Sequence, residues 1–315
     1  MKTDPGEGRQ ERRHVKRHGE YMIQGKRYGF SSDIRDNKIL RRSFNELSAQ
    51  VFGGLTFEPW FQAGYWNEKF CPFVLLDGER VVSNVSVNSI SFQYEGKLRE
   101  YIQLGTVMTA PDYRKRGLSR WLMERILERF RDGCDGVYLF ANDSVLDFYP
   151  RFGFEKAREY QCVRTLEGGL ENARKLDMES AAGRALLWET YAASAPYAKL
   201  AFPRNPELLM FYCGGQLRDC VYYLEEKKAV VVAEYKGDIM LCYGVFCEGG
   251  ASLDELLRSA AKKETLQVQF LFSPWDAREE EIRVYKEEDT TLFLLKGSEN
   301  LFQRDTLMFP VLSHT

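Results

Sequence analysis

The sequence is poor in the residues that build disulfide frameworks and zinc sites. Its seven cysteines are an odd number, no two of them stand in a Cys-x-x-Cys arrangement, and His14, His18 and His314 are the only histidines. Secreted disulfide scaffolds use even sets of cysteines, and structural zinc sites need clustered cysteine and histidine. We therefore expect buried, reduced thiols and no metal site.

Long apolar runs and a surplus of one charge are also missing. No apolar stretch approaches the roughly 18 residues that span a membrane, and the first twenty residues hold no apolar run of the signal-peptide kind. Lys and Arg number 44 against 46 Asp and Glu, a formal charge of −2. Neither a membrane nor nucleic acid is therefore expected as a partner, and the expected location is cytoplasmic.

Hydrophobic residues are plentiful enough for two cores. They make up 44% of the 315 residues, and domains usually hold roughly 100–150 residues. Residues 1–20 carry six Lys or Arg and are expected to form a flexible, solvated basic arm. A contact of this arm with RNA or a membrane is the alternative.

The hydrophobic pattern predicts an order of elements that occurs twice. A helix over 35–53 precedes antiparallel strands over 73–76, 81–94 and 98–108, a helix over 118–130, a strand over 137–140, a short helix over 145–149 and a strand over 154–164. The second half has helices over 171–191 and 206–212, strands over 221–224, 229–235 and 239–246, a helix over 253–261, and strands over 268–272, 290–295 and 309–313. A duplicated domain is the economical explanation.

An aromatic stretch over 57–70 has two possible roles. It contains Phe57, Trp60, Phe61, Tyr65, Trp66 and Phe70. Such residues either cover a core or form the wall of a substrate site. Glu58 and Glu68 in the same stretch would suit a cationic amine.

A basic loop with one glycine directly precedes the helix predicted from Leu118. The first turn of a helix has unpaired N–H groups and a partial positive charge, which together favour phosphate. Gly117 allows a close approach of the backbone, and Ser119 is small. Arg114, Lys115, Arg116 and Arg120 add full charges.

The residues that follow resemble a known superfamily. The spacing Arg114-x-x-Gly117-x-Ser119, then Asn142, then Tyr149-x-Arg151-x-Gly153-Phe154 is similar to that of the GNAT N-acetyltransferases. The resemblance covers about residues 35–164. It implies an α/β fold, with a mixed, mostly antiparallel GNAT sheet flanked by helices in a catalytic domain over 21–166. A degenerate GNAT-like α/β domain over 167–315 would complete a tandem protein.

The resemblance also implies a site for acetyl-CoA as co-substrate, with no metal. Backbone groups of Val107, Met108 and Thr109 would pair with the pantetheine arm. Amides of Arg114, Lys115, Arg116, Gly117, Leu118, Ser119 and Arg120 would hold the pyrophosphate. Asn142 would contact the pantetheine or orient the site, and the Tyr149 hydroxyl would protonate the departing thiolate. Tyr149 packed merely as a core tyrosine is the alternative.

Gln103 departs from the pattern of relatives that carry a glutamate base at this position. An amide cannot take a proton, so the amine would lose its proton to bound water, to water oriented by Gln103, or to a carboxylate elsewhere. Tandem members similar to the mycobacterial enhanced-survival acetyltransferases use their terminal carboxylate, which here would be Thr315. An acyl-cysteine on Cys134 or Cys162 is not expected, since neither lies in the motif.

The second half lacks the basic loop. Residues 247–252 contain no Arg or Lys, and Glu248 would repel phosphate. We therefore expect one active site per chain, transferring an acetyl group from acetyl-CoA to a primary amine of a small molecule or peptide. The alternatives are a non-catalytic acyl-CoA sensor and an aminoacyl or long-chain acyl transferase. The oligomeric state is left open.

Overall fold

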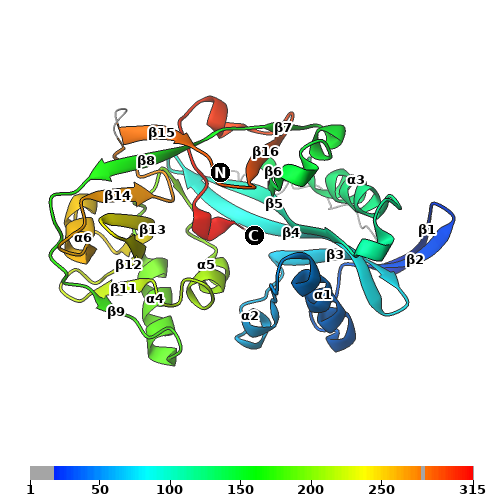
Figure 1. Ribbon diagram of the computed structural model, residues 1–315, viewed down its shortest axis with the longest axis horizontal. Coiled ribbons are helices and arrows are strands. Elements are labelled where there is room, and N and C mark those ends of the chain that lie inside the picture. Colours follow the sequence, from blue (N-terminus) through cyan, green and yellow to red (C-terminus); the bar gives the residue numbers. More distant parts are fainter. Residues whose placement is uncertain (1–17, 278–280, 315) are drawn as a thin grey trace, which may run out of the picture.

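The computed structural model describes residues 18–277 and 281–314, and Figure 1 shows them as two sheets that lie side by side with helices around them. This architecture is the predicted α/β class of mixed, mostly antiparallel sheets. The basic arm expected over 1–20 lies outside the described residues, except that residues 18–20 begin the first strand.

The first sheet carries the basic loop. In spatial order its strands are β1 (His18–Ile23), β2 (Lys26–Ser31), β3 (Phe70–Asp77), β4 (Arg80–Tyr94), β5 (Lys97–Thr109), β6 (Gly136–Ala141), β16 (Thr291–Leu295) and β7 (Phe154–Lys156), with β10 (Leu200–Ala201) paired to the end of β4. Only β5 and β6 run parallel among these pairs. The hairpin of β1 and β2 was not predicted, because its alternation of apolar residues is weak.

Helices cover both faces of this sheet. They are α1 (Lys38–Val51), α2 (Glu58–Gln62) and α3 (Leu118–Phe130). Val82 and Val85 pack beneath α3, whereas Val74 and Val81 pack beneath α1. Successive strand residues point to opposite faces, so the two helices lie on opposite sides. The Asn37 side chain starts α1 by accepting hydrogen bonds from the first-turn amides.

The second sheet holds most of the remaining chain. Its strands in order are β15 (Ile282–Tyr285), β8 (Glu159–Thr165), β14 (Gln267–Phe270), β13 (Ile239–Cys247), β12 (Ala229–Lys236), β11 (Val221–Leu224) and β9 (Arg174–Lys175). Its helices are α4 (Ala181–Ala193), α5 (Pro206–Cys213) and α6 (Leu253–Ala260). The pair β13 and β14 is parallel, as β5 and β6 are in the first sheet.

The sheets exchange strands across the domain boundary expected at residue 166. The single strand predicted over 154–164 is divided: β7 stays in the first sheet, and β8 pairs with β14 and β15 in the second. Conversely, β16 inserts between β6 and β7. The division into domains over 21–166 and 167–315 stays a prediction. It assigns β8 to the first domain and β16 to the second, although β8 pairs in the second sheet and β16 in the first.

Three predicted elements were wrong in detail. Residues 309–313 do not form a strand, because Pro310 precedes a 3-10 turn over Val311–Ser313. The helix expected over 171–191 begins only at Ala181, where Ser180 caps it. The helix expected over 145–149 is replaced by 3-10 turns over Asp143–Val145 and Tyr149–Phe152.

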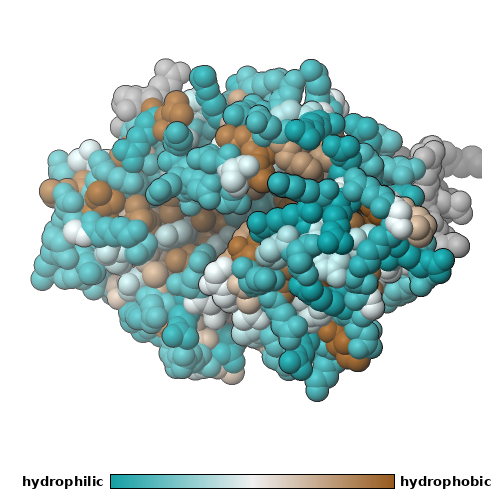
Figure 2. Space-filling model, turned by 45° about the vertical axis from the view of Figure 1, so that its right-hand side comes forward, coloured by the Kyte–Doolittle hydropathy of each residue, from teal (hydrophilic) through white to brown (hydrophobic). Residues whose placement is uncertain are grey.

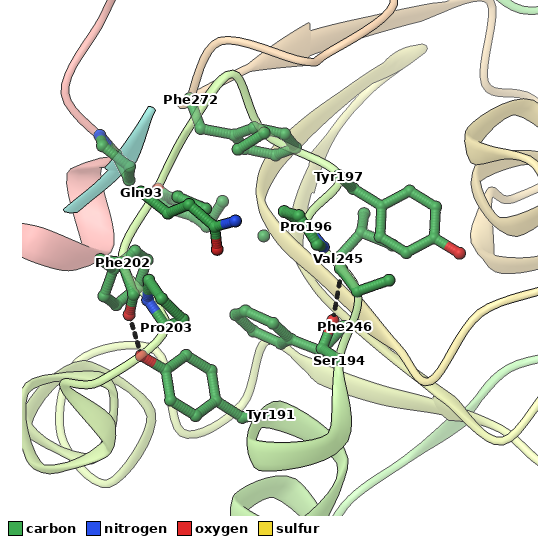
Figure 3. A pocket seen from close by; sticks show the side chains of 16 residues that line it. Gln93, Tyr191, Ser194, Pro196, Tyr197, Phe202, Pro203, Val245, Phe246 and Phe272 are labelled. Atoms are coloured by element: carbon green, nitrogen blue, oxygen red, sulfur yellow. Dashed lines mark hydrogen bonds between the residues drawn. The ribbon is translucent and has the colours of Figure 1, made fainter. Parts of the chain in front are cut away.

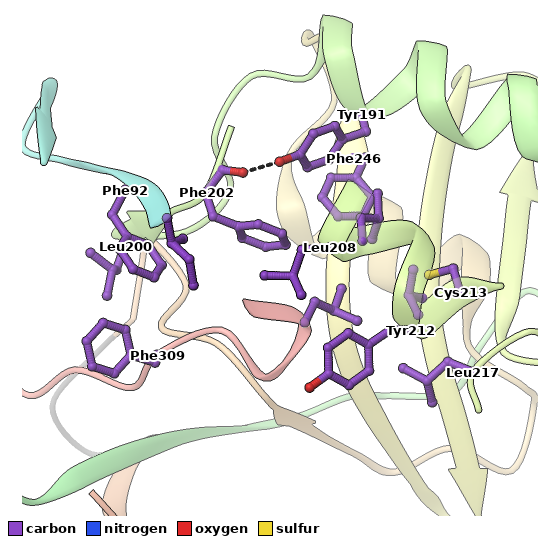
Figure 4. Packing of buried hydrophobic residues seen from close by; sticks show 14 of the residues in the cluster. Phe92, Tyr191, Leu200, Phe202, Leu208, Tyr212, Cys213, Leu217, Phe246 and Phe309 are labelled. Atoms are coloured by element: carbon purple, nitrogen blue, oxygen red, sulfur yellow. Dashed lines mark hydrogen bonds between the residues drawn. The ribbon is translucent and has the colours of Figure 1, made fainter. Parts of the chain in front are cut away.

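One hydrophobic core joins the two sheets. Figure 4 shows Phe92 of β4 and Phe309 near the C-terminus on the same side of the cluster as Leu200, with Tyr212 and Phe246 farther along it. Burying a side chain such as Leu or Phe contributes roughly 1.5–3 kcal/mol. The halves are therefore held together by the same kind of packing that holds each sheet.

The aromatic stretch 57–70 belongs mainly to a core. Phe57, Trp60, Trp66 and Phe70 are buried around Phe44 of α1. Glu58 is occupied by an ion pair in which its Oε2 lies 2.9 Å from Arg41 Nε. The core role is therefore confirmed for these four aromatic residues, and Glu58 is already neutralised within the protein.

Candidate active site

The basic loop and the start of α3 form a pocket at the surface. Gly117 has φ +72° and is the N-cap of α3, with no side chain capping the first-turn amides. Such left-handed backbone strains any residue with a Cβ. The pocket has a volume of about 590 Å³, and Gln24 of the β1–β2 turn lies across from Gly117. The free N–H groups therefore face a cavity large enough for a phosphate-bearing ligand.

The loop keeps its positive charges available. In the described part of the chain, Arg114, Lys115, Arg116 and Arg120 form no ion pair with a carboxylate, and all four are exposed. Their neighbour Asp112 is instead paired with Arg80, at 2.8 Å between Oδ2 and NH1. Four unpaired cations beside a helix N-terminus make a strong attraction for an anion with several charges.

A chain of hydroxyl groups fixes the loop to the sheet. The Oγ atoms of Thr109 and Ser119 lie 2.7 Å apart, and Thr109 Oγ1 lies 2.9 Å from Ser83 Oγ. Both Thr109 and Ser119 were predicted site residues, and the structure places them in contact. Ser119 is thus small and also ties the first turn of α3 to β5.

Next to the loop, β5 and β6 diverge. Their parallel pairing ends where Gln103 lies opposite Tyr138. On the other edge of β5, a bulge leaves Thr106 and Val107 outside the register with β4, and Thr106 has φ +42°. Val107 and Thr109 are half-buried, whereas the Met108 side chain is buried under α1. The backbone of 107–109 therefore borders a gap between strands, and its pairing with a pantetheine arm stays a prediction.

Tyr149 lies in the core of the first sheet, in the same cluster as the apolar face of α3. Its ring packs between Phe154 and Phe293, and only 4% of the residue is exposed. Burial raises the pKa of Tyr149 to about 12, so the hydroxyl keeps its proton at physiological pH. Arg151 of the motif and Phe148, which precedes Tyr149 in the chain, line the same pocket as the basic loop. Both parts of the motif thus meet in space.

Asn142 is held by a residue from the far end of the chain. Its amide donates to Asp289 Oδ2 at 2.9 Å, and the Asp143 amide donates to the other oxygen at 2.6 Å. Asp289 precedes β16, so the sequence offered no signal for this contact. The expected contact of Asn142 with pantetheine stays a prediction, and the structure adds Asp289 as the residue that orients it.

Gln103 is fully buried and faces neutral polar groups. Tyr138 donates from its hydroxyl to Gln103 Oε1 at 3.2 Å. Asn88 is the partner of Gln103 on β4, so both point to the same face. Amides and hydroxyls therefore surround this position.

The C-terminal segment closes this face. It packs on two residues of β6, Tyr138 and Phe140. Ser313 is hydrogen-bonded to Tyr138, and the centroid of the His314 ring lies 4.0 Å from that of the Phe140 ring. Burial lowers the pKa of His314 to about 3, so its imidazole is neutral. Thr315 lies outside the described residues. Sequence reasoning missed Tyr138 and this packing because both depend on contacts between distant segments.

Figure 2 shows that the surface is hollowed near the middle of the face it displays.

In the second sheet, the corresponding gap is filled by the chain itself. The parallel pairing of β13 and β14 ends at Cys242 and Phe270. Beyond it, the Ala195 amide donates to the Cys247 carbonyl at 2.9 Å, and the Lys199 amide donates to the Ser273 carbonyl at 2.8 Å. Residues 195–199 therefore lie where an added strand would pair.

We predict a stoichiometry of one coenzyme per chain, because the second gap is filled and its loop carries Glu248 instead of cations. Isothermal titration calorimetry with CoA measures this number directly. A value near two would contradict the prediction. A Glu248→Lys variant with unchanged stoichiometry would show that the filled gap alone is sufficient to exclude a second coenzyme.

All seven cysteines are free; four are buried as expected, whereas Cys71, Cys134 and Cys220 are only partly buried. Burial raises the pKa of Cys134 to about 11 and that of Cys162 to about 12. Thiols of this kind are protonated at neutral pH and poor nucleophiles. This agrees with the expectation that neither forms an acyl-cysteine. Within the described ranges, no group of three His, Cys, Asp or Glu is placed to hold a metal ion.

A buried carboxyl group supports the C-terminal segment. Glu159 of β8 accepts a hydrogen bond from the Phe309 amide at 2.9 Å. Burial raises its pKa to about 8, and nearby Glu287 acts in the same direction against the Phe309 amide. Tyr138 and Tyr285 also lie close to it.

We predict that Glu159→Gln removes a loss of stability that develops in wild type as the pH rises from about 4.5 to 8. Below pH 4.5 the Glu159 carboxyl is neutral in the folded and in the unfolded chain. Between about pH 4.5 and 8 it ionises only in the unfolded chain, so the free energy of unfolding falls by up to about 1.4 kcal/mol per pH unit. We expect the free energy of unfolding, measured in urea, to rise by several kcal/mol in the variant relative to wild type between pH 5 and pH 8. Exposed Glu226→Gln serves as the control. Parallel pH profiles of wild type and Glu159→Gln would contradict the prediction.

Comparisons with known proteins agree with this geometry. Residues 37–157 match the family model of the acetyltransferase (GNAT) domain. The fold is similar to that of a GCN5-related N-acetyltransferase from Kribbella flavida, with 20% identity, 85% of this chain and 71% of that one covered, and a TM-score of 0.53. It is also similar to a probable N-acyltransferase from Enterococcus faecalis, with 13% identity, coverage of 81% and 68%, and a TM-score of 0.51.

Residues 37–157 therefore form a GNAT acetyltransferase domain, and the fold of the chain as a whole is similar to that of solved GCN5-related N-acetyltransferases. A GCN5-related N-acetyltransferase from Anabaena variabilis has the same fold, with 13% identity, coverage of 85% and 72%, and a TM-score of 0.52. No curated protein sequence matches the chain. No helix among residues 18–277 and 281–314 is both long and apolar enough to cross a membrane.

Proposed function

We propose that the protein transfers an acetyl group from acetyl-CoA to a primary amine of a small molecule or peptide, in the cytoplasm. The observation that carries this proposal is the loop over 114–120, where four cations without carboxylate partners in the described chain surround the open start of α3. This loop borders the gap between β5 and β6. A diphosphate with an extended thioester arm matches both features.

The residues present fit the coenzyme. The amides from Arg114 to Arg120, with their side-chain cations, would hold the pyrophosphate. Backbone groups of Val107, Met108 and Thr109 would pair with the arm as an added strand does. Asn142, oriented by Asp289, would contact the same arm. When bound, acetyl-CoA supplies an activated acyl group, so positioning provides much of the rate.

Direct attack in a ternary complex needs two proton transfers. The amine nitrogen forms a bond to the thioester carbon, and the carbon–sulfur bond breaks. Tyr149 would give its proton to the departing thiolate and regain one from water; its raised pKa keeps the hydroxyl protonated before the reaction. The proton of the amine passes to water, to water oriented by Gln103, or to the Thr315 carboxylate.

Two alternatives have a physical basis. Gln103 in place of a carboxylate suits a protein that binds acyl-CoA without turnover. A longer acyl chain or an aminoacyl group suits the same loop, because the loop recognises the phosphates and not the acyl part.

A thermal-shift titration tests the proposal. A ligand at 100 times its dissociation constant adds about 2.7 kcal/mol of stability. Acetyl-CoA and CoA should both raise the melting temperature, and ATP should not. A panel of primary amines should then release free thiol from acetyl-CoA. No shift with either coenzyme would overturn the proposal. A shift without thiol release would favour the acyl-CoA sensor, and faster release from octanoyl-CoA would favour longer acyl groups.

A further inference from the structure

The first sheet presents an uncharged face toward α1 at the gap between β5 and β6. Asn84 of β4 pairs with Met108, which packs beneath α1, and strand residues two positions apart point to the same face. Gln103 lies opposite Asn88, and Tyr138 donates to Gln103. The side chains of this face at the gap are therefore amides, hydroxyls and an aromatic ring: Asn84, Ser86, Asn88, Gln103, Tyr138 and Phe140.

An acceptor amine has to reach the gap from this face. The pocket of the basic loop lies at α3, with Phe148 and Arg151 in its wall, and Tyr149 belongs to the core beneath α3. Because α1 and α3 cover opposite sides of the sheet, a coenzyme held by the loop leaves the α1 side for the amine. This step rests on the proposed function.

Asn84 carries a buried oxygen that has no hydrogen-bond partner. The residue is 0% exposed, and its Oδ1 is unpaired. Its amide is oriented, because Nδ2 donates to the Thr106 carbonyl at 2.8 Å and to Ser86 Oγ at 3.0 Å. Thr106 belongs to the bulge of β5 beside the gap. A buried acceptor without a donor is unfavourable, so this oxygen suits a ligand that carries an N–H group.

His314 supplies a second buried acceptor on the same face. Its ring lies on Phe140 of β6, and its Nε2 is buried without a partner. The other ring nitrogen is hydrogen-bonded to the backbone of Phe309. A neutral imidazole has one donor and one acceptor nitrogen, so the bond to the Phe309 carbonyl leaves the lone pair on Nε2.

The acids closest to this face are engaged or lie elsewhere. Asp289 already accepts two hydrogen bonds from the residues that follow β6, and Glu159 is bound to a backbone amide. Glu287 is exposed in the wall of another cavity. Burial and a backbone carbonyl set the pKa of His314, and burial alone raises that of Tyr149. Within the described chain, no ionised side chain therefore acts on either side of the gap.

We propose that the acceptor is a weakly basic amine of the aromatic class, uncharged at neutral pH, whose nitrogen donates to His314 Nε2 and Asn84 Oδ1. An alkyl amine such as the Lys side chain has a pKa of about 10.4, so roughly one molecule in 2,500 is neutral at pH 7. Burying its charged form among uncharged groups is unfavourable. An aromatic amine avoids this cost, and its ring matches the Phe140 surface.

This substrate class explains why an amide at position 103 is sufficient. The amine nitrogen forms a bond to the acyl carbon, and the carbon–sulfur bond breaks. An aromatic nitrogen becomes strongly acidic as that bond forms, so its proton passes to water without a carboxylate base. Tyr149 protonates the thiolate and regains a proton from water. His314 and Asn84 are positioning residues, which hold the N–H groups so that the lone pair faces the acyl carbon.

The cavity between the two sheets does not offer the amine another place. It lies beside Pro196 and Tyr197 and has a volume of about 70 Å³, and Figure 3 shows uncharged side chains such as Phe202 and Val245 in its wall. Benzene occupies a cavity of roughly 150 Å³. An aromatic amine is therefore too large for this cavity, and its binding reports on the gap.

Aniline and cyclohexylamine form a matched test pair, because their rings are of similar size and only cyclohexylamine is protonated at pH 7. With the full chain and saturating acetyl-CoA, we expect kcat/KM at pH 7 to be at least tenfold higher for aniline. Between pH 6 and pH 8 the value for aniline should stay constant, whereas that for cyclohexylamine should rise about tenfold per pH unit. A higher value for cyclohexylamine at pH 7 would overturn the proposal.

Two variants test the uncharged face. His314→Phe keeps a ring on Phe140 but removes the lone pair, and should raise KM for aniline at least tenfold without changing the affinity for CoA. Gln103→Glu adds a carboxylate of the same shape, and should raise kcat/KM for cyclohexylamine at least tenfold but not that for aniline. Exposed Gln303→Glu is the control. An unchanged preference in folded Gln103→Glu overturns the proposal even where His314→Phe does not fold.

Saturation-transfer NMR separates this inference from the proposed function, because it detects amine binding without turnover. Transfer to aniline but not to cyclohexylamine in the CoA complex at pH 7 supports the inference; if no thiol is then released from acetyl-CoA, only the proposed function fails. Thiol release with cyclohexylamine and no transfer to aniline overturns the inference and leaves the proposed function standing. Neither binding nor thiol release with either amine overturns the inference.

Discussion

Gly117→Glu should weaken the binding of acetyl-CoA at least 100-fold. Residue 117 is the N-cap of α3 and has left-handed backbone. A glutamate side chain there would extend into the space beside Gln24, because a Cβ added at Gly117 would already lie 3.1 Å from Gln24 Nε2. Its carboxylate would repel the phosphates and compete for Arg114 and Lys115. A 100-fold change corresponds to about 2.7 kcal/mol, a loss that one well-placed like charge together with blocked amides supplies.

The measurement is calorimetric titration of CoA and acetyl-CoA into both proteins. Because a left-handed position also costs about 1–2 kcal/mol for a residue with a Cβ, stability alone does not separate binding from folding. Gly237→Glu is the matched control: Gly237 has φ +61°, nothing lies near its Cβ position, and it belongs to the turn between β12 and β13. Equal binding by Gly117→Glu and Gly237→Glu would contradict the assignment of the loop.

Tyr149→Phe should lower kcat by at least 100-fold and leave the affinity for CoA nearly unchanged. Loss of a general acid typically costs 10²–10⁴-fold. The ring contacts with Phe154 and Phe293 remain in the variant. Among the described residues, the Tyr149 hydroxyl has no hydrogen-bond partner, so its removal should change the free energy of unfolding little.

The pH dependence provides a second readout for Tyr149. With a pKa of about 12, this hydroxyl stays protonated through the neutral range, so it should not limit the rate below about pH 11. Tyr235→Phe, which removes a partly buried hydroxyl of the second sheet bonded to the Ala260 carbonyl, is the control. A Tyr149→Phe enzyme with wild-type kcat would assign the tyrosine to core packing, the alternative that its surroundings also allow.

Local signals in the sequence specified the loop well. Gly117, the cations around it and the apolar face of α3 are close together in the chain, so their arrangement follows from the geometry of one strand, one turn and one helix. The same holds for the hairpins of β3, β4 and β5, whose turns are short. The capping box at Ser252 and Glu255 also marked the start of α6 correctly.

Contacts between distant segments were beyond such signals. The sequence could not reveal that β16 enters the first sheet, that Asp289 orients Asn142, or that the C-terminal turn packs on Tyr138. Each of these pairs residues more than 140 positions apart. The aromatic stretch over 57–70 was equally ambiguous, because a buried aromatic residue and a substrate wall have the same composition. Only packing against α1 decided it.

The sequence by itself determined the GNAT acetyltransferase domain of the first half, the basic loop and the absence of a matching loop in the second half, because those depend on residue type and short spacing. The tertiary structure decided which strands share a sheet and that residues 195–199 fill the second gap. It also decided that an uncharged cavity remains beside them. Those outcomes depend on which distant surfaces bury each other most completely, and burial is a property of the whole fold rather than of any short segment.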